Sequence, residues 1–73
     1  MSESLDIAAR LLKVSDLLHR LGSERLDEGK SFMKMDVLDE VDNLFDEANL
    51  LFDAEKVVLE KVKAIHDSLR SQP

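Results

Sequence analysis

The most regular feature of the chain is a row of mostly apolar positions in its second half, spaced alternately four and three residues apart. Only one member of this row is polar, and the full set is Val37, Val41, Leu44, Ala48, Leu51, Glu55, Val58, Val62, Ile65 and Leu69. This spacing gathers side chains onto one side of an α-helix, whereas a β-strand would alternate them between two faces. The row therefore predicts one long amphipathic helix over about residues 34–70.

A second row runs beside the first and recurs at every seventh residue: Leu38, Phe45, Phe52, Leu59 and His66. On a heptad the first row takes positions a and d, and the second row takes position e. A helix that is apolar at a, d and e together has a face wider than the one a two-stranded coil uses. We therefore expect the long helix to contact two partner helices.

The first half of the chain carries a shorter stripe of the same kind, formed by Ile7, Leu11, Val14, Leu18 and Leu21. This stripe predicts a helix over about residues 4–21. Gly22 follows the last leucine, at the position where a left-handed glycine commonly ends a helix. Residues 22–31, which include Gly29, are accordingly predicted to form a connecting loop.

These elements predict an all-α fold, with residues 1–73 as a single helical-hairpin domain. A short first helix would cover the N-terminal half of the long second helix and leave the C-terminal half uncovered. We expect a second copy to cover that half, which makes the assembly an antiparallel dimeric helical bundle; a parallel dimer and a tetramer stay open. The predicted oligomer interface comprises Phe52, Glu55, Val57, Val58, Leu59, Val62, Ile65 and Leu69.

The size of the chain also favours a second copy. A domain of 73 residues buries too little surface to be more than marginally stable, and small domains usually add disulfides, a metal or an oligomeric partner. The chain has no cysteine, which excludes disulfides and thiolate metal sites, and its two histidines do not make a ligand set. We expect no metal and no cofactor, so self-association is the favoured supplement.

The net charge of −6 disfavours nucleic acid and anionic membranes as direct partners, because both are bound through Lys and Arg. No run approaches the roughly 18 apolar residues of a membrane span, and the N-terminus lacks the pattern of a secretory signal. We therefore expect a cytoplasmic protein. A basic protein partner is compatible with an acidic, solvent-facing surface on the long helix, formed by Asp39, Asp42, Asp46 and Asp53.

Two further features of the long helix concern its packing. Glu55 occupies an a position, and a buried carboxylate is costly unless it is paired, so either a Lys, Arg or His should lie near it or the site should be open to water. A weaker apolar stripe, interrupted by Lys61, consists of Leu50, Ala54, Val57 and Ala64. This stripe either widens the dimer core or forms a docking groove for another protein.

Both histidines lie in stretches that resemble phosphoacceptor sites. The segment from Leu18 to Ser23 is similar to the phosphorylatable histidine region of histidine phosphotransfer domains, and the segment from Ile65 to Leu69 resembles the phosphoacceptor stretch of one histidine kinase subfamily. The resemblances imply phosphotransfer at His19 or His66. We favour structural roles, since His19 suits a helix C-terminus and His66 continues the e row.

No serine or cysteine nucleophile stands in a recognisable triad, so we expect no enzymatic activity. The leading hypothesis is a protein–protein interaction module: a small, acidic, self-associating adaptor, chaperone or inhibitor. The alternative is an acidic regulator, of the antirepressor or nuclease-inhibitor type, that occupies the basic nucleic-acid-binding surface of a partner protein.

Overall fold

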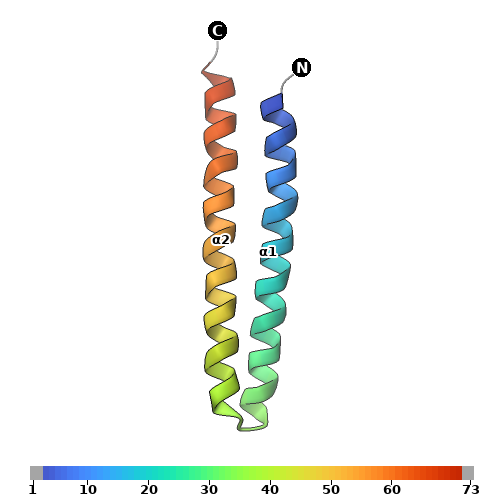
Figure 1. The fold of residues 1–73 in the computed structure, drawn as a ribbon, viewed down its shortest axis with the longest axis vertical. Coiled ribbons are helices and arrows are strands. Elements are labelled where there is room, and N and C mark those ends of the chain that lie inside the picture. The colour runs from blue at the N-terminus through green and yellow to red at the C-terminus, as the bar shows by residue number, and fades with distance from the viewer. Residues whose placement is uncertain (1–2, 72–73) are drawn as a thin grey trace.

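The protein is a hairpin of two long antiparallel helices, described here from a computed structural model for residues 3–71. Helix α1 spans Glu3–Lys34 and helix α2 spans Leu38–Arg70, with residues 35–37 as the connection. The helices lie side by side along their whole length, so the two ends of the chain meet at one end and the turn lies at the other (Figure 1). The predicted all-α hairpin is confirmed.

The predicted length of the first helix was wrong. α1 continues through Gly22 and Gly29 to Lys34, so residues 22–31 form three helical turns and no loop. Neither glycine has a positive φ, and both are buried. They extend a series of small residues at every seventh position of α1, all of them buried: Ala8, Ser15, Gly22 and Gly29.

The small residues of α1 make room for aromatic rings of α2. A Cβ atom on Gly22 would lie 2.7 Å from Cε1 of Phe52, and one on Gly29 would lie 2.5 Å from Cε1 of Phe45. Glycine in a helix interior costs about 1 kcal/mol relative to alanine. The space that the rings occupy explains why the helix nevertheless has glycine at both positions.

The core lies between the helices, and on α2 it follows the predicted row. Val41, Leu44, Ala48 and Val62 are buried, and the members between and after them are half-buried: Leu51, Glu55, Val58, Ile65 and Leu69. Ala48 is completely inaccessible. The row therefore packs against α1 over nearly the whole length of α2.

On α1 the predicted stripe is half-buried at Leu11, Leu18 and Leu21, but the prediction was wrong at Ile7 and Val14. Ile7 and Val14 are 48% and 44% exposed, while their neighbours Ala8 and Ser15 are buried. A close approach of two helices selects small side chains at the line of contact, which moves the larger ones to its flanks. The hydroxyl of Ser15 donates to the carbonyl oxygen of Leu12 at 2.8 Å, so its burial leaves no unsatisfied donor.

The turn depends on one residue with a left-handed backbone. Asp36 has φ of 62°, a conformation that aspartate tolerates better than most residues. The backbone N–H of Val37 donates to the carbonyl oxygen of Phe32 at 3.0 Å, which closes the end of α1. The chain therefore reverses after Lys34, and α2 begins at Leu38 instead of near residue 34.

The longer α1 removes the premise on which the arrangement of the dimer was predicted. The C-terminal half of α2 is not left uncovered, because α1 of the same chain reaches it: Ile7 and Leu11 line one groove together with Ile65 and Leu69. Neither helix of the described chain is long and apolar enough to cross a membrane.

Candidate interaction surfaces

Two rows of side chains at seven-residue spacing form one apolar face of the hairpin, here called the phenylalanine face. The ring of His19 on α1 lies 5.6 Å from the ring of Phe52 on α2, which fixes the register of the rows. From this pair each row continues in steps of seven residues, and the two rows run in opposite directions because the helices are antiparallel. The face therefore has five residues from each helix: Leu5, Leu12, His19, Leu26 and Met33 of α1, with Leu38, Phe45, Phe52, Leu59 and His66 of α2.

The phenylalanine face is mostly apolar and remains accessible to solvent. Its exposed aliphatic members are Leu5 at 50%, Leu12 at 41%, Met33 at 50%, Leu38 at 59% and Leu59 at 42%. Within residues 3–71, no large side chain is fully buried, so the hairpin alone builds only a thin core of small and partly covered residues. A continuous exposed apolar face on a thin core is typical of a surface that packs against another protein.

A polar pair lies at the middle of the phenylalanine face. Nδ1 of His19 lies 3.1 Å from Oε1 of Glu55, whose side chain is 20% exposed. The prediction that Glu55 would have a basic neighbour is confirmed. A shallow hollow of about 650 Å³ opens beside this pair and is lined by both residues together with Phe52, Lys56, Leu59, Glu60 and Lys63.

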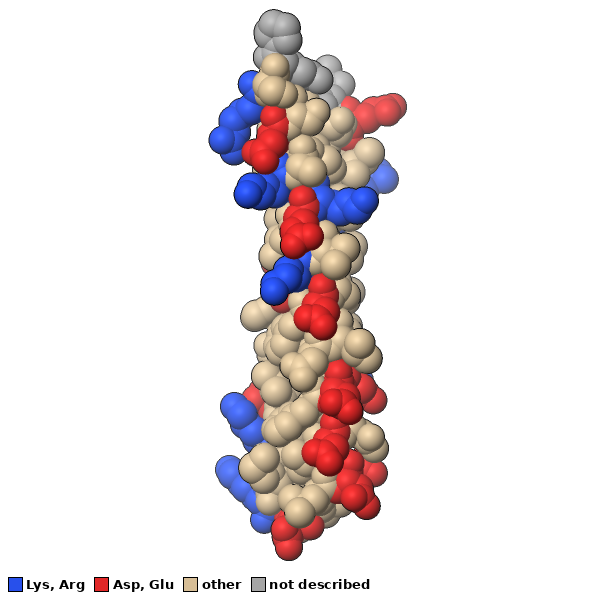
Figure 2. All heavy atoms as spheres, turned by 90° about the vertical axis from the view of Figure 1, so that its left-hand side faces the viewer, with Lys and Arg blue, Asp and Glu red and all other residues tan. Residues whose placement is uncertain are grey.

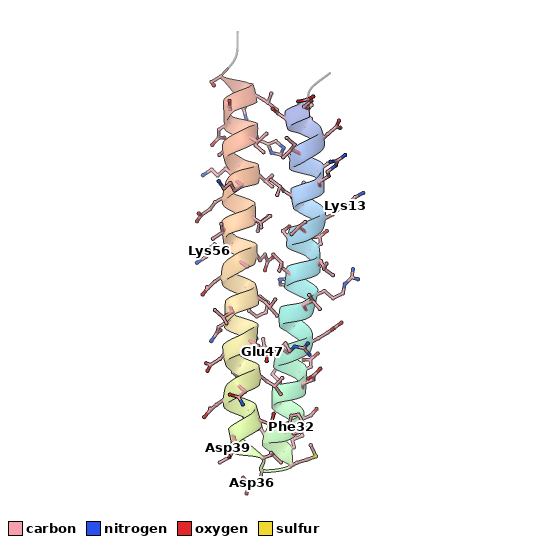
Figure 3. The ribbon with its side chains drawn as sticks, viewed as in Figure 1. Lys13, Phe32, Asp36, Asp39, Glu47 and Lys56 are labelled. Carbon is pink, nitrogen blue, oxygen red and sulfur yellow. The ribbon has the colours of Figure 1, made fainter. Side chains whose placement is uncertain are left out.

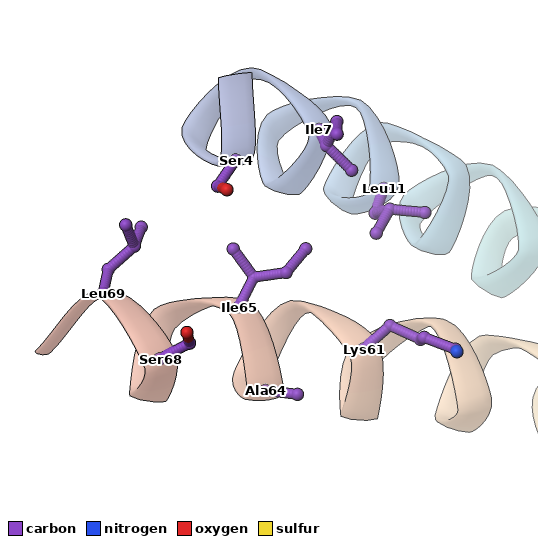
Figure 4. A pocket seen from close by; sticks show the side chains of 8 residues that line it. All are labelled: Ser4, Ile7, Leu11, Lys61, Ala64, Ile65, Ser68 and Leu69. Atoms are coloured by element: carbon purple, nitrogen blue, oxygen red, sulfur yellow. The ribbon is translucent and has the colours of Figure 1, made fainter. Parts of the chain in front are cut away.

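A second surface, here called the terminal groove, lies on the other side of the hairpin near the chain ends. Its volume is about 370 Å³, and the side chains of Ile65 and Leu69 point from α2 toward α1 across it (Figure 4). Lys61 is the charged residue of its lining. Farther along this side, two members of the weaker apolar stripe, Leu50 and Val57, are 70% and 56% exposed.

The outer side of α2 carries a column of carboxylates, here called the acidic ridge. Its members recur at every seventh residue and are all exposed: Asp39, Asp46, Asp53, Glu60 and Asp67. Figure 2 shows the column running along the helix. Of the predicted acidic surface, Asp42 lies off this ridge, at the heptad position next to the phenylalanine face.

The residues predicted for the oligomer interface divide among three places. Glu55, Val58, Val62, Ile65 and Leu69 pack in the core row against α1, so their burial does not require a second copy. Phe52 and Leu59 belong to the phenylalanine face, and Val57 lies on the opposite side. Leu5 and Leu12 widen the stripe of the predicted first helix, but sequence reasoning did not continue their row to Leu26 and Met33, although the seven-residue spacing signals it.

The charged side chains at the edges of the hairpin are mostly unpaired. Nε of Arg25 lies 3.2 Å from Oε2 of Glu47, and this is an ion pair that joins the two helices near the turn. Lys13 and Lys56 project away from the contact between the helices on opposite edges (Figure 3). Among residues 3–71, no group of three or more His, Cys, Asp or Glu side chains is arranged to hold a metal ion.

Comparison of the chain with protein-family models, with curated proteins and with solved structures finds no match.

Proposed function

We propose that this chain is a non-enzymatic protein-interaction module that associates with itself through the phenylalanine face and serves as a small acidic adaptor, chaperone or inhibitor. The observation that carries the proposal is the continuous apolar face that both helices share. Because the terminal groove lies on the other side of the hairpin, self-association leaves it accessible to a different protein.

The exposed apolar side chains of the face supply a driving force for association. Complete burial of a leucine or phenylalanine side chain contributes about 1.5–3 kcal/mol relative to its exposed state. Leu12, Leu38 and Leu59 are each at least 41% exposed in the hairpin. In a dimer these three side chains would become buried in both copies. Homodimers bury surfaces of this apolar character, and a small helical chain gains stability from such contacts.

Sedimentation equilibrium of two matched variants tests the proposal. Leu59→Glu places a carboxylate on the phenylalanine face, and Val57→Glu places one on the opposite side at a similar exposure, 56% against 42%. We expect wild type and Val57→Glu to sediment as dimers at micromolar concentrations and Leu59→Glu as a folded monomer. A wild-type chain that is monomeric and fully helical over the same range would contradict self-association.

A second candidate function rests on the acidic ridge. Five exposed carboxylates at seven-residue spacing recur about every 10 Å along α2, a regular line of negative charge that suits the basic surface of a nucleic-acid-binding protein. Binding of the chain to such a protein should weaken steeply as salt rises and should be lost in Asp46→Lys/Asp53→Lys. Binding that is insensitive to salt and lost in a terminal-groove variant, Ala64→Glu, would favour the interaction module instead.

A further inference from the structure

The phenylalanine face is bordered on each edge by charged side chains that form no ion pair within the hairpin. They occupy the heptad position next to the apolar rows: Asp16 and Lys30 on α1, and Asp42 and Lys56 on α2. All four are exposed, and none takes part in an ion pair among residues 3–71. Asp16 and Lys30 on α1, and likewise Asp42 and Lys56 on α2, lie fourteen residues apart, or about 21 Å. Lys63 and Arg70 are two further bases at the same heptad position of α2.

The heights of these charges along the hairpin are matched. Asp16 lines a hollow with His19 and Glu55, and Lys56 lines another with the same two residues, so Asp16 and Lys56 lie at one level on opposite edges. Lys30 lies fourteen residues after Asp16 on α1, and Asp42 lies fourteen residues before Lys56 on α2. Because the helices are antiparallel, Lys30 and Asp42 also lie at one level. At each of these two levels, the face therefore has an acid on one edge and a base on the other.

We propose that the phenylalanine face binds a second copy of this chain about a two-fold axis parallel to the helices, so that α1 of each copy lies on α2 of the other and the two turns lie at the same end. This inference rests on the proposed self-association and specifies its geometry. A two-fold axis along the helices preserves height, so Asp16 meets the partner's Lys56 and Lys30 meets the partner's Asp42. Symmetry doubles these to four ion pairs at the rim of a four-helix bundle.

The apolar rows match in the same arrangement. Leu12 lies over the partner's Leu59, and Leu26 lies over the partner's Phe45. His19 lies over the partner's Phe52, at the middle of the bundle. At the same rim, Ala9 meets the partner's Lys63 and Ser23 meets the partner's Asn49, so no two like charges oppose each other at these four levels.

The other two-fold arrangement, with the turns at opposite ends, is less complementary. It places α1 antiparallel to the partner's α1, and α2 antiparallel to the partner's α2. Since Asp16 and Lys56 lie close to the middles of their helices, full overlap brings Lys56 toward the partner's Lys56 and Asp16 toward the partner's Asp16, while Asp42 and the partner's Lys63 come together as opposite charges. Like charges at an interface oppose association, which favours the arrangement with the turns together.

Two charge-exchange variants test the geometry. Asp16→Lys/Lys30→Asp exchanges the charges on α1, and Asp42→Lys/Lys56→Asp exchanges them on α2. Each keeps the net charge of −6. In the proposed dimer either variant alone opposes like charges at all four rim contacts, whereas a mixture of the two restores every pair in the heterodimer. The control Lys13→Asp/Asp27→Lys makes the same exchange at outward positions of α1.

We expect each exchange variant alone to dimerise about tenfold or more weakly than wild type, and an equimolar mixture to form heterodimers with nearly wild-type affinity. The control should dimerise like wild type. Because the variants have identical masses, one is labelled with ¹⁵N and the heterodimer is identified by native mass spectrometry. Circular dichroism checks helicity, and the chain with all four substitutions, which restores the pairs in a homodimer, serves where a variant folds poorly.

Two results would overturn the geometry: exchange variants that dimerise like wild type, or a mixture that gains nothing over its components. Both are distinguishable from failure of self-association itself, in which the wild-type chain is already monomeric.

Discussion

Replacement of Gly29 by alanine tests whether the glycines of α1 serve packing. Alanine raises intrinsic helix stability by about 1 kcal/mol relative to glycine. In this hairpin, however, the new Cβ would lie 2.5 Å from Cε1 of Phe45, about 1 Å inside normal carbon–carbon contact. Overpacking of this kind costs about 1–3 kcal/mol. We therefore expect Gly29→Ala to lower the free energy of unfolding by up to about 2 kcal/mol.

The same substitution should have the opposite sign when the ring is absent. In a Phe45→Ala background the overlap disappears and only the gain in helix propensity remains, so adding Gly29→Ala should raise the free energy of unfolding by about 1 kcal/mol. Urea denaturation followed by circular dichroism, at one fixed protein concentration, measures all four chains of the cycle. Ser31→Ala, an exposed change in the same helix, should have one small effect in both backgrounds.

Equal stabilisation by Gly29→Ala with and without the Phe45 ring would refute the packing role. It would mean that the ring moves aside at no cost and that glycine at this position has no part in the contact between the helices.

The remaining predictions concern the core and the turn. Ala48→Leu should lower the free energy of unfolding by about 1–3 kcal/mol, because Ala48 is 0% exposed and the added carbons have no space, whereas Ala54→Leu on the exposed flank should change it little. At the turn, Asp36→Gly should raise the free energy of unfolding by about 0.5–1 kcal/mol, and Asp36→Val should lower it by about 1 kcal/mol or more, because φ at this residue is 62°. Urea denaturation measures each change, and equal stability of the glycine and valine chains would contradict the assigned backbone strain.

Sequence reasoning predicted α2 correctly because the pattern that specifies this helix lies entirely within it. The core row of α2 alternates four and three residues without interruption, and its second row repeats every seven, so both the helix and its wide apolar face follow from local geometry. The basic neighbour of Glu55 followed from the cost of a buried carboxylate, and His19 fills that role.

The extent of α1 could not be predicted from the same rules. Glycine commonly ends a helix, so Gly22 and Gly29 suggest a helix end when the sequence is considered alone. In the structure both glycines leave space for the rings of Phe52 and Phe45, which come from the other helix. Helix propensity is a local quantity, and here a contact between distant segments overrides it. With α1 taken to end at residue 21, Leu26 fell in the predicted loop and Met33 before the predicted second helix, so neither was placed on the phenylalanine face.

A single distance across the dimer tests most directly whether two hairpins associate through the phenylalanine face with their turns together. The chain has no cysteine, and Met35 in the turn is 60% exposed, so Met35→Cys accepts one spin label per chain. In pulsed electron–electron double resonance we expect one population of label separations below about 30 Å, since packed helices lie 8–10 Å apart. A separation near the length of α2, about 50 Å, would contradict the arrangement, and the absence of any dipolar signal would contradict self-association.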